Sequence, residues 1–403
     1  MTAIHDCHPL QGVTVLEFGH TILGPCCGLV LADLGAEVIK VEPPEGDRTR
    51  TLKGFGSGYF SFFNRNKKSI TLDIKSPAGR RNAEALAASA DVLIENMAPG
   101  ALERAGLGAK ALRRLNPRLI YCSLKGFLPG PYGSRVALDE VVQMMSGLAY
   151  MTGPPGQPLR AGTSITDIMG GVFGALGIVA ALMDRDQKPD GSGAVVEAAL
   201  FETAAFLMGQ HMAYSAVSAA PVPPMPARVS AWAIYELFDS ADGQRVFIGI
   251  TSDNHWQSFC QEFNRPDLFA DPALATNSQR IDARPTLLPA LQALFGALPA
   301  DEIVQRCQAA KMPCAAVGRP EDLFDDPQLL AAGSLAETTI GPGQHTRLPL
   351  LPIRVDGRPF DLRSDPPVMG ADTAEVLARV GAEPPQPAAS RQLHRYTSSD
   401  AGE

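Results

Sequence analysis

Short apolar segments alternate with helical segments along residues 13–124. The strand-like segments are Val13–Phe18, Glu37–Val41, Ser69–Ile74, Asp91–Glu95 and Leu119–Leu124. The helical segments between them are Gly24–Leu34, Pro77–Ser89 and one that opens at Pro99. Neighbouring parallel strands need a crossover between them, and that crossover is usually a helix. The alternation therefore predicts βαβ units and a mostly parallel sheet.

The middle of the chain changes character after a proline-rich stretch. A helix over Ile168–Met183, a strand over Ala194–Glu197 and a helix over Leu200–Tyr214 continue the first pattern. The stretch Ala219–Pro226 is rich in Ala and Pro, as stiff linkers are. Beyond it we expect a hairpin, two helices and a last strand, over Ile234–Phe238, Val246–Ile250, Asn254–Phe263, Arg284–Leu298 and Met312–Val317. This order predicts a second domain of the α+β class.

Composition and charge exclude several classes of protein. The chain has 403 residues, a net charge of −8, 45% apolar and 19% charged residues, which is typical of a globular protein. Its basic residues are scattered, so we expect no nucleic-acid surface. The N-terminus lacks the pattern of a signal peptide, and the apolar run Ile168–Met183 is short and interrupted by glycines. We therefore expect no membrane span and a cytoplasmic protein.

The sequence also lacks the short motifs that identify common cofactor and metal sites. The seven cysteines and seven histidines form no pair with metal-ligand spacing, so we expect no metal and free, largely buried thiols. No Walker A motif, no zinc-protease motif and no G-x-S-x-G turn is present. The glycine-rich run Gly54–Gly58 follows a polar loop rather than a strand, so it gives little support to a dinucleotide site.

Asp167 stands where a polar loop leads into the long helix of small residues. A carboxylate there faces the positive end of the helix dipole, so we expect it to stay ionised. Asp is a favoured residue at the start of a helix, and Asp167 has that structural interpretation. An ionised carboxylate beside glycines, which admit a bulky acyl group, has a second interpretation as a nucleophile. Local sequence leaves both open.

Five blocks of sequence occur in an order that resembles one known family. They are Pro9–Phe18 (PLQGVTVLEF), Leu31–Pro44 (LADLGAEVIKVEPP), Asn64–Ile70 (NRNKKSI), Asp91–Gly100 (DVLIENMAPG) and Asn116–Tyr121 (NPRLIY). Together they resemble the family III CoA-transferases, the CaiB/BaiF-like group, which includes the formyl-CoA transferases. The resemblance extends over nearly the whole chain.

The resemblance implies an α/β fold with a Rossmann-like large domain made from both chain ends, and a smaller α+β domain inserted in it. It implies a large domain over residues 1–218, a linker over 219–228, a small domain over 229–325 and a return to the large domain, with a tail, over 326–403. It also implies that two chains form an interlocked homodimer. Its nucleophile matches Asp167, and its substrates are an acyl-CoA thioester and a carboxylic acid, with no metal or further cofactor.

The same resemblance assigns contacts with CoA position by position. The pantetheine arm is expected beside His20, and Asn96 and Met97 match the segment that brackets the adenine and the pantetheine. The phosphates are expected near basic residues, with Lys67 and Lys68 as alternatives in one loop. The basic positions are Lys40, Lys67, Lys68 and Arg104.

Two departures from the family pattern narrow the expected reaction. The related α-methylacyl-CoA racemases carry a histidine where this chain has Leu138, and formyl-CoA transferases carry a glycine-run loop where it has Ser230–Ala233. We therefore expect a CoA-transferase acting through aspartyl anhydride and aspartyl-CoA intermediates, with small dicarboxylates such as succinate as substrates, and not formyl or oxalyl transfer. The alternatives are a racemase-like proton-transfer enzyme and a non-catalytic acyl-CoA-binding relative.

Overall fold

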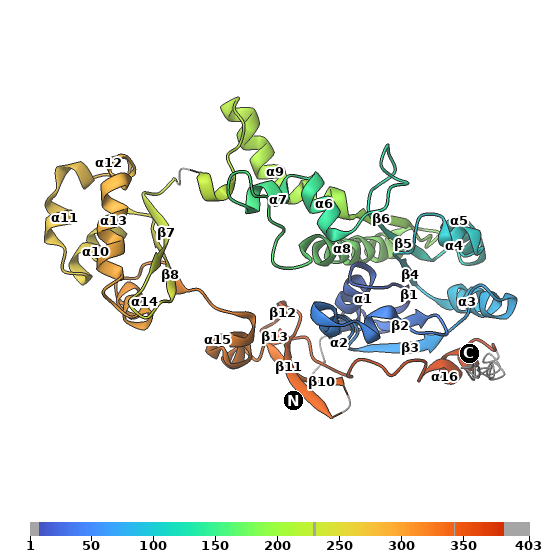
Figure 1. Cartoon of the computed structure of the whole chain (residues 1–403). Helices are drawn as coiled ribbons and strands as arrows, with labels where there is room; N and C mark the ends of the chain where they lie inside the picture. Colours follow the sequence, from blue (N-terminus) through green and yellow to red (C-terminus); the bar gives the residue numbers. More distant parts are fainter. Residues whose placement is uncertain (1–7, 229–230, 342, 383–403) are drawn as a thin grey trace, which may run out of the picture. The chain divides into compact units, whose positions relative to one another are not determined.

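The computed structural model describes residues 8–228, 231–341 and 343–382. The chain divides into two compact units, one formed by Met1–Pro226 with Gln328–Glu403 and the other by Ala227–Pro327 (Figure 1). Two regions discussed above lie outside the described residues. They are Ser230, the first residue of the segment that replaces the glycine-run loop, and the tail expected from Pro384 onward.

A six-stranded parallel sheet forms the centre of the first unit, with the strand order β3-β2-β1-β4-β5-β6 (Figure 1). Its strands are β1 (Thr14–Phe18), β2 (Glu37–Glu42), β3 (Lys67–Thr71), β4 (Val92–Glu95), β5 (Ile120–Lys125) and β6 (Val195–Ala199). The order reverses between β1 and β4, the arrangement of doubly wound folds. The predicted α/β class with a parallel sheet is therefore confirmed.

Helices cover both faces of this sheet because both faces of its strands are apolar. In β1, Val15 belongs to one core and its neighbour Leu16 to the other, as the period of two in a strand requires. The first core includes residues of α1 (Leu23–Asp33) and α8 (Ile165–Gln187). The second core includes residues of α3 (Pro77–Ser89), α5 (Ala109–Leu115) and α16 (Thr373–Arg379).

The C-terminal part of the chain returns to the edge of this sheet. The Asp372 N–H donates to the carbonyl of Ser69 at 3.0 Å, and the Ser69 N–H donates to Asp372 Oδ2 at 2.8 Å. These bonds continue the exposed edge of β3 into the segment that leads to α16. Further helices and strands occur before and after the second unit in the order of the chain. They are α2 (Tyr59–Phe63), α4 (Ala101–Arg104), α6 (Asp139–Met145), α7 (Leu148–Thr152), α9 (Leu200–Ser218), α15 (Pro327–Ala331), β10 (Leu335–Gly341), β11 (Gln344–Pro349), β12 (Arg354–Val355) and β13 (Arg358–Pro359).

The second unit has its own antiparallel sheet and its own core. Strands β7 (Ile234–Asp239) and β8 (Arg245–Ile250) form the predicted hairpin, whose turn contains Gly243 at φ 75°. Strand β9 (Cys314–Ala316) pairs with β8. The helices are α10 (Asp253–Glu262), α11 (Pro266–Ala270), α12 (Asn277–Asp282), α13 (Arg284–Phe295) and α14 (Ala300–Ala309). Apolar side chains from α10, α13 and α14 bury the inner face of this sheet.

Glycines on α8 allow it to lie very close to α1. A Cβ added at Gly171 would lie 2.8 Å from Cys26 Cβ and 2.9 Å from the Leu23 carbonyl oxygen. A Cβ at Gly174 would lie 2.7 Å from Leu124 Cδ2 on β5. Because backbone and core atoms occupy these positions, no larger residue fits without moving the helix. The glycines therefore fix the position of the N-terminal half of α8.

The length predicted for this helix was wrong. It runs over Ile165–Gln187 rather than Ile168–Met183, and among the described residues it is the single helix long and apolar enough to cross a membrane alone. The pair α13 and α14 passes the same test only as a bent pair. In the structure α8 packs on α1, β5 and β6, which is the position of a core helix.

We predict that Gly171→Ala lowers the free energy of unfolding by about 1–3 kcal/mol, because the added methyl group meets the backbone of α1. Gly58→Ala, just before α2, is the control, since open space surrounds its added Cβ and its φ of −90° suits alanine. The control should raise stability by up to about 1 kcal/mol by reducing the freedom of the unfolded chain. Urea unfolding of both variants measures the two effects, and equal stabilities would contradict the close α1–α8 contact.

Candidate functional site

A cleft of about 520 Å³ opens at the carboxyl ends of β1, β2, β3 and β4 in the first unit. Ligands of doubly wound folds bind at this edge, beside the point where the strand order reverses. The cleft is lined by the segments that follow these four strands, namely Phe18–Thr21, Val41–Arg48, Leu72–Lys75 and Met97 with Ala98. The sheet topology therefore places the cleft where a nucleotide-like ligand is expected.

The loop after β1 is held by the side chain of Asn96. Asn96 Oδ1 accepts from the His20 N–H and Asn96 Nδ2 donates to the His20 carbonyl, both at 2.9 Å. His20 Nδ1 lies 2.9 Å from the Thr21 hydroxyl, and Thr21 adopts φ 65°. Desolvation lowers the pKa of His20, which favours its neutral imidazole. The structure thus brings His20, Asn96 and Met97 together, with His20 and Met97 lining the cleft.

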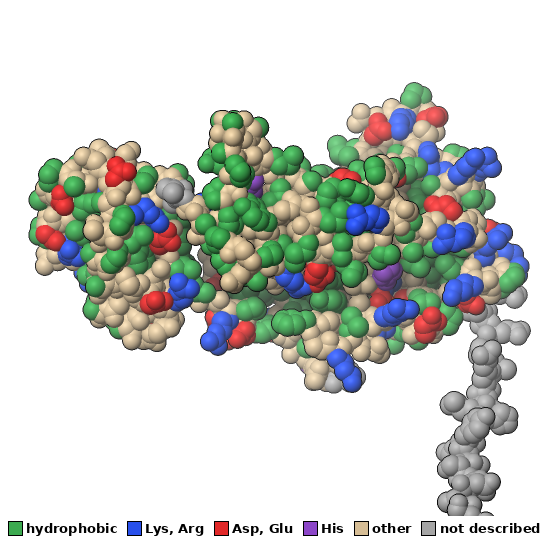
Figure 2. Space-filling view, turned by 45° about the horizontal axis from the view of Figure 1, so that its top comes forward, with side chains coloured by type: hydrophobic (Ala, Val, Ile, Leu, Met, Phe, Trp, Pro, Cys, Tyr) green, Lys and Arg blue, Asp and Glu red, His purple; other side chains and the backbone are tan. Residues whose placement is uncertain are grey.

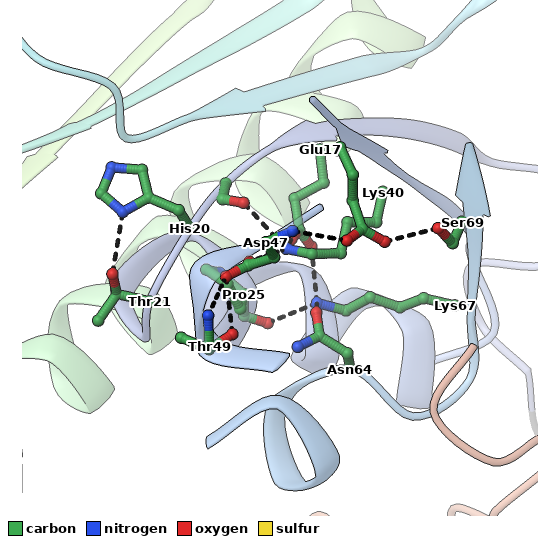
Figure 3. Close-up of polar contacts among 12 residues, drawn as sticks. Glu17, His20, Thr21, Pro25, Lys40, Asp47, Thr49, Asn64, Lys67 and Ser69 are labelled. Atoms are coloured by element: carbon green, nitrogen blue, oxygen red, sulfur yellow. Dashed lines mark hydrogen bonds and ion pairs between the residues drawn. The ribbon is translucent and has the colours of Figure 1, made fainter. Parts of the chain in front are cut away.

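Lys40 lies inside the protein rather than in the cleft. Its ammonium is fully buried and contacts Asp47 Oδ2 at 2.8 Å, the Gly19 carbonyl at 2.9 Å and Glu17 Oε1 at 3.2 Å (Figure 3). Burial opposes the charge, yet the carboxylates of Glu17 and Asp47 raise the pKa of Lys40. Gly19 follows β1, Asp47 follows β2, and both residues line the cleft. Lys40 therefore joins these two segments of the lining, and the expected phosphate contact would require breaking these pairs.

Lys67 is also buried, on the other oxygen of the same glutamate. Its ammonium contacts Glu17 Oε2 at 2.7 Å, the Pro25 carbonyl at 2.9 Å and Asn64 Oδ1 at 3.1 Å (Figure 3). Burial, together with the charge of Lys40, lowers the pKa of Lys67. A buried ammonium with three partners has no free direction toward a phosphate. Lys67 fixes the start of α1 instead.

The two remaining cationic candidates lie outside the cleft lining. Lys68 pairs with Glu37 at 2.9 Å and with Glu375 at 3.0 Å. Glu37 is the first residue of β2, so this ion pair lies at the amino edge of the parallel sheet, opposite to the cleft. Arg104 is exposed and donates to the Pro99 carbonyl at 3.3 Å. Of these two, Arg104 alone is on the carboxyl side of its strand.

Sequence reasoning missed the two cations that do line the cleft. Arg48 follows β2 and Lys75 follows β3, and both are exposed at the cleft. The signal for them was the parallel sheet itself, because the residues after its strands meet at one edge. Arginine and lysine at such an edge can bind phosphate groups.

Asp167 is the third residue of α8 and does not cap the helix. Asp139 of α6 takes that role, because its Oδ1 accepts from the Thr166 N–H at 2.8 Å, the Thr166 hydroxyl at 2.5 Å and the Asp167 N–H at 3.4 Å. Among the described residues, no hydrogen bond or ion pair reaches the carboxylate oxygens of Asp167. The carboxylate of Asp167 is therefore half-buried and unengaged.

The expectation that Asp167 stays fully ionised was wrong. Burial, followed by the charges of Asp139 and Glu140, raises the pKa of Asp167 to about 7. The helix dipole does favour the anion, but two nearby acids and loss of solvent outweigh it. Near neutral pH, Asp167 therefore exists in both protonation states.

Asp167 is not among the residues that line the cleft, but the loop after β1 is linked to the helix of Asp167 through α1. After Thr21 the chain enters α1, and Leu23 and Cys26 of α1 pack against the glycines of α8. Cys26 Sγ donates to the carbonyl of Ile168, the residue after Asp167, at 3.5 Å. Burial raises the pKa of Cys26 to about 12, so its thiol is neutral. The cleft and Asp167 are thus connected through the start of α1.

No group of three or more metal-ligating side chains occurs in the part of the chain that the structure describes. The described cysteines are free thiols, and all but Cys314 are buried. The ionisable side chains described at this site are carboxylates, one imidazole and the cations of the cleft.

Comparisons with known proteins match the chain along nearly its whole length. The sequence model of CoA-transferase family III matches residues 10–373. A succinate–glutarate CoA-transferase of Agrobacterium fabrum is 32% identical over 391 residues, which cover 92% of this chain and 96% of the relative. An acetyl-CoA:oxalate CoA-transferase of Acetobacter aceti is 36% identical over 338 residues, which cover 82% of this chain and 86% of the relative.

Solved structures agree with these relatives. A CaiB/BaiF family protein from Brucella suis matches with a TM-score of 0.83 and 31% identity, and the match covers 93% of this chain and 100% of the Brucella chain. Rv3272 from Mycobacterium tuberculosis matches with a TM-score of 0.80 and 30% identity, and the match covers 92% of this chain and 99% of the Rv3272 chain. The predicted family is thereby confirmed: the chain is an enzyme that belongs to CoA-transferase family III.

Proposed function

We propose that this enzyme moves CoA from a small dicarboxylic acyl-CoA, such as succinyl-CoA, to a carboxylic acid acceptor, with Asp167 as the nucleophile. The observation that carries the proposal is the carboxylate of Asp167, which is half-buried and unengaged while Asp139 caps its helix. A carboxylate that serves only as a cap would be engaged by backbone N–H groups.

The proposed cycle uses carboxylates and CoA alone. An oxygen of Asp167 attacks the thioester carbon of the donor, the C–S bond breaks, and CoA leaves as a thiolate. The thiolate then attacks the Asp167 carbonyl of the mixed anhydride and releases the donor acid, which leaves an aspartyl-CoA thioester. The acceptor carboxylate attacks this thioester and releases CoA as a thiolate. The thiolate attacks the acceptor acyl group of the new anhydride, so that the acceptor acyl-CoA forms and Asp167 leaves as a carboxylate. Covalent catalysis divides one difficult exchange into easier steps.

The cleft at the carboxyl edge of the sheet is the proposed site for CoA. Its volume and its position at the strand-order reversal support this assignment. Arg48 and Lys75 would hold phosphate groups, Met97 would contact the adenine, and the His20 loop would direct the pantetheine arm toward α1 and Asp167. Arg104 stays a proposed phosphate contact from the resemblance, because its side chain is exposed on the carboxyl side of β4.

The proposed acids come from the names of the relatives. They are CoA-transferases for succinate and glutarate, for oxalate, for D-citramalate and for mesaconate. The relative named for oxalate weakens the expectation that oxalyl transfer is excluded, so oxalate belongs among the acceptors to test. We keep succinyl-CoA as the first donor because it is named in several relatives.

The racemase-like alternative receives little support from the site. Leu138 takes the position where the racemases carry a histidine, and its side chain is 61% exposed. Uptake of deuterium from solvent into the acyl group of an acyl-CoA, without transfer, would favour the racemase instead.

A screen with succinyl-CoA and a panel of acids tests the proposed activity. We expect at least one acceptor among glutarate, oxalate, D-citramalate and mesaconate to become its CoA thioester. Asp167→Asn should lower this transfer at least about a thousandfold, since the amide cannot attack a thioester. Asp184→Asn is the control on the same helix, at an exposed ion pair with Lys188, and should stay near wild-type activity. Near-normal turnover of Asp167→Asn would contradict the proposal.

The KM for acyl-CoA of four variants tests whether the cations that line the cleft, rather than Lys68, bind the phosphates of CoA. Arg48→Ala and Lys75→Ala should raise the KM for acyl-CoA by about 3–30-fold with little change in kcat, because phosphate contacts exist in ground and transition states alike. Arg104→Ala tests the contact that the resemblance assigns. Lys68→Ala should leave KM unchanged, and acyl-pantetheine should be used equally by all four variants. A raised KM for Lys68→Ala alone would refute this placement of CoA.

We further propose that the enzyme is an interlocked homodimer. Large apolar side chains on α8 and α9 are exposed in the single chain, among them Leu176, Met183, Phe206 and Met212, each more than 60% exposed. Hydrophobic side chains are widespread on the face drawn in Figure 2. Exposed apolar surface of this kind usually marks an interface, and the family resemblance supplies the second copy as its partner.

Threaded chains cannot separate unless one of them unfolds at least in part. We therefore predict that the dimer persists on dilution and that its dissociation coincides with unfolding. Sedimentation at nanomolar concentration measures this directly. A compact, folded monomer under those conditions would rule out the interlocked arrangement.

A further inference from the structure

Asp139 is a buried acid that the proposed cycle does not yet use. It is 3% exposed, and it accepts hydrogen bonds from Thr166, from the Asp167 N–H and, at 2.5 Å, from Gln143 Nε2. Gln143 is itself fully buried, and its Oε1 accepts from the Ala161 N–H at 2.8 Å. Asp139 and Gln143, one turn apart on α6, thus hold the loop and the first turn that present Asp167.

The charges that face Asp167 come from one element. Asp139 and Glu140 belong to α6, and Glu140 pairs with Arg160. From α1 the facing group is Cys26, whose thiol is neutral because burial raises its pKa to about 12. On α9, Thr203 lies near the N-terminal part of α8, beside Gly170. Its hydroxyl donates to the Ala199 carbonyl, and it carries no charge. The groups that raise the pKa of Asp167 besides burial are therefore two carboxylates, Asp139 first.

We propose that Asp139 is a positioning residue for CoA transfer: it caps α8 in place of Asp167, and its charge destabilises the Asp167 anion relative to the acylated state. This inference rests on the proposed function, because it requires Asp167 to be the nucleophile.

The chemistry follows from the charge balance of the first step. When an Asp167 oxygen bonds to the thioester carbon and the C–S bond breaks, the electron pair leaves with CoA as thiolate. Asp167 changes from an anion to a neutral anhydride. Repulsion from Asp139 is present before this step and is lost during it. An interaction that is less unfavourable in the transition state than in the ground state lowers the barrier.

The helix cap and the charge act together in this arrangement. A carboxylate bound by three N–H or O–H donors cannot turn away from Asp167 to relieve the repulsion. Asp167 cannot relieve it by capping its own helix, because Asp139 already occupies that position. The basicity of Asp167 is thereby raised, and a more basic oxygen is a better nucleophile once it is ionised.

The test is the pH profile of kcat for Asp139→Asn. Activity needs ionised Asp167, so kcat falls as pH decreases through its pKa, which is about 7 in the wild type. The amide keeps an oxygen for the Thr166 N–H but removes the charge. We expect the acid limb to move down by about one pH unit or more, kcat at pH 8.5 to fall about tenfold, and the KM for acyl-CoA to stay within about twofold. A role in folding alone would lower kcat equally at every pH.

Glu140→Gln is the matched control, because it removes the next charge on α6 without touching the cap of α8. Its acid limb should move by less than half as much. If Asp139→Asn is poorly folded, the double variant Asp139→Asn, Gln143→Glu restores an acceptor for the new amide and moves the charge away from the helix start. It should show a shift in the same direction. An unchanged acid limb, or equal shifts in Asp139→Asn and Glu140→Gln, overturns the inference.

Failure of this inference is distinguishable from failure of the proposed function. If Asp167→Asn remains active, Asp167 is not the nucleophile, and both the proposed mechanism and the role of Asp139 are refuted. If Asp167→Asn is inactive while Asp139→Asn keeps the wild-type pH profile, the proposed function stands and the role of Asp139 is refuted.

Discussion

The close contact between α1 and α8 is the constraint on which the site depends. Gly171 leaves no room for a side chain against Leu23 and Cys26, so the two helices are fixed relative to each other near their N-termini. The loop before α1 lines the cleft at the carboxyl edge of the sheet, and the first turn of α8 carries Asp167. One packing contact therefore sets the relation between the proposed CoA site and the proposed nucleophile.

A buried ionic cluster stabilises the same loop, the one between β1 and α1. One carboxylate oxygen of Glu17 pairs with Lys40 and the other pairs with Lys67 (Figure 3). Lys40 also contacts Gly19 and Asp47. Lys67 also contacts the start of α1. Buried ion pairs add little net stability when desolvation is counted. Their value here is geometric, because breaking one partner leaves an uncompensated charge, and the walls of the cleft are thereby held in one arrangement.

The sequence was sufficient to predict the parallel sheet, and insufficient to predict the directions of side chains. Alternating apolar segments predicted the parallel sheet because each strand is buried on both faces. Lys40 and Lys67 were misplaced because a lysine in an apolar strand has the same sequence signature whether it meets a ligand or a buried carboxylate such as Glu17. The hydrogen bonds that Asp139 accepts from the first turn of α8 were not predicted, because they depend on α6 lying beside α8, a long-range contact that no local pattern encodes.

The central claim is that CoA transfer passes through a covalent bond to Asp167, and trapping tests it most directly. The enzyme would be mixed with succinyl-CoA and hydroxylamine, digested and analysed by peptide mass spectrometry. Hydroxylamine converts an activated carboxyl group into a hydroxamate, so the account predicts this change on Asp167 in a donor-dependent manner, with Asp139 and Glu140 unmodified. Modification of another carboxylate, or none at Asp167 during active turnover, would contradict the account.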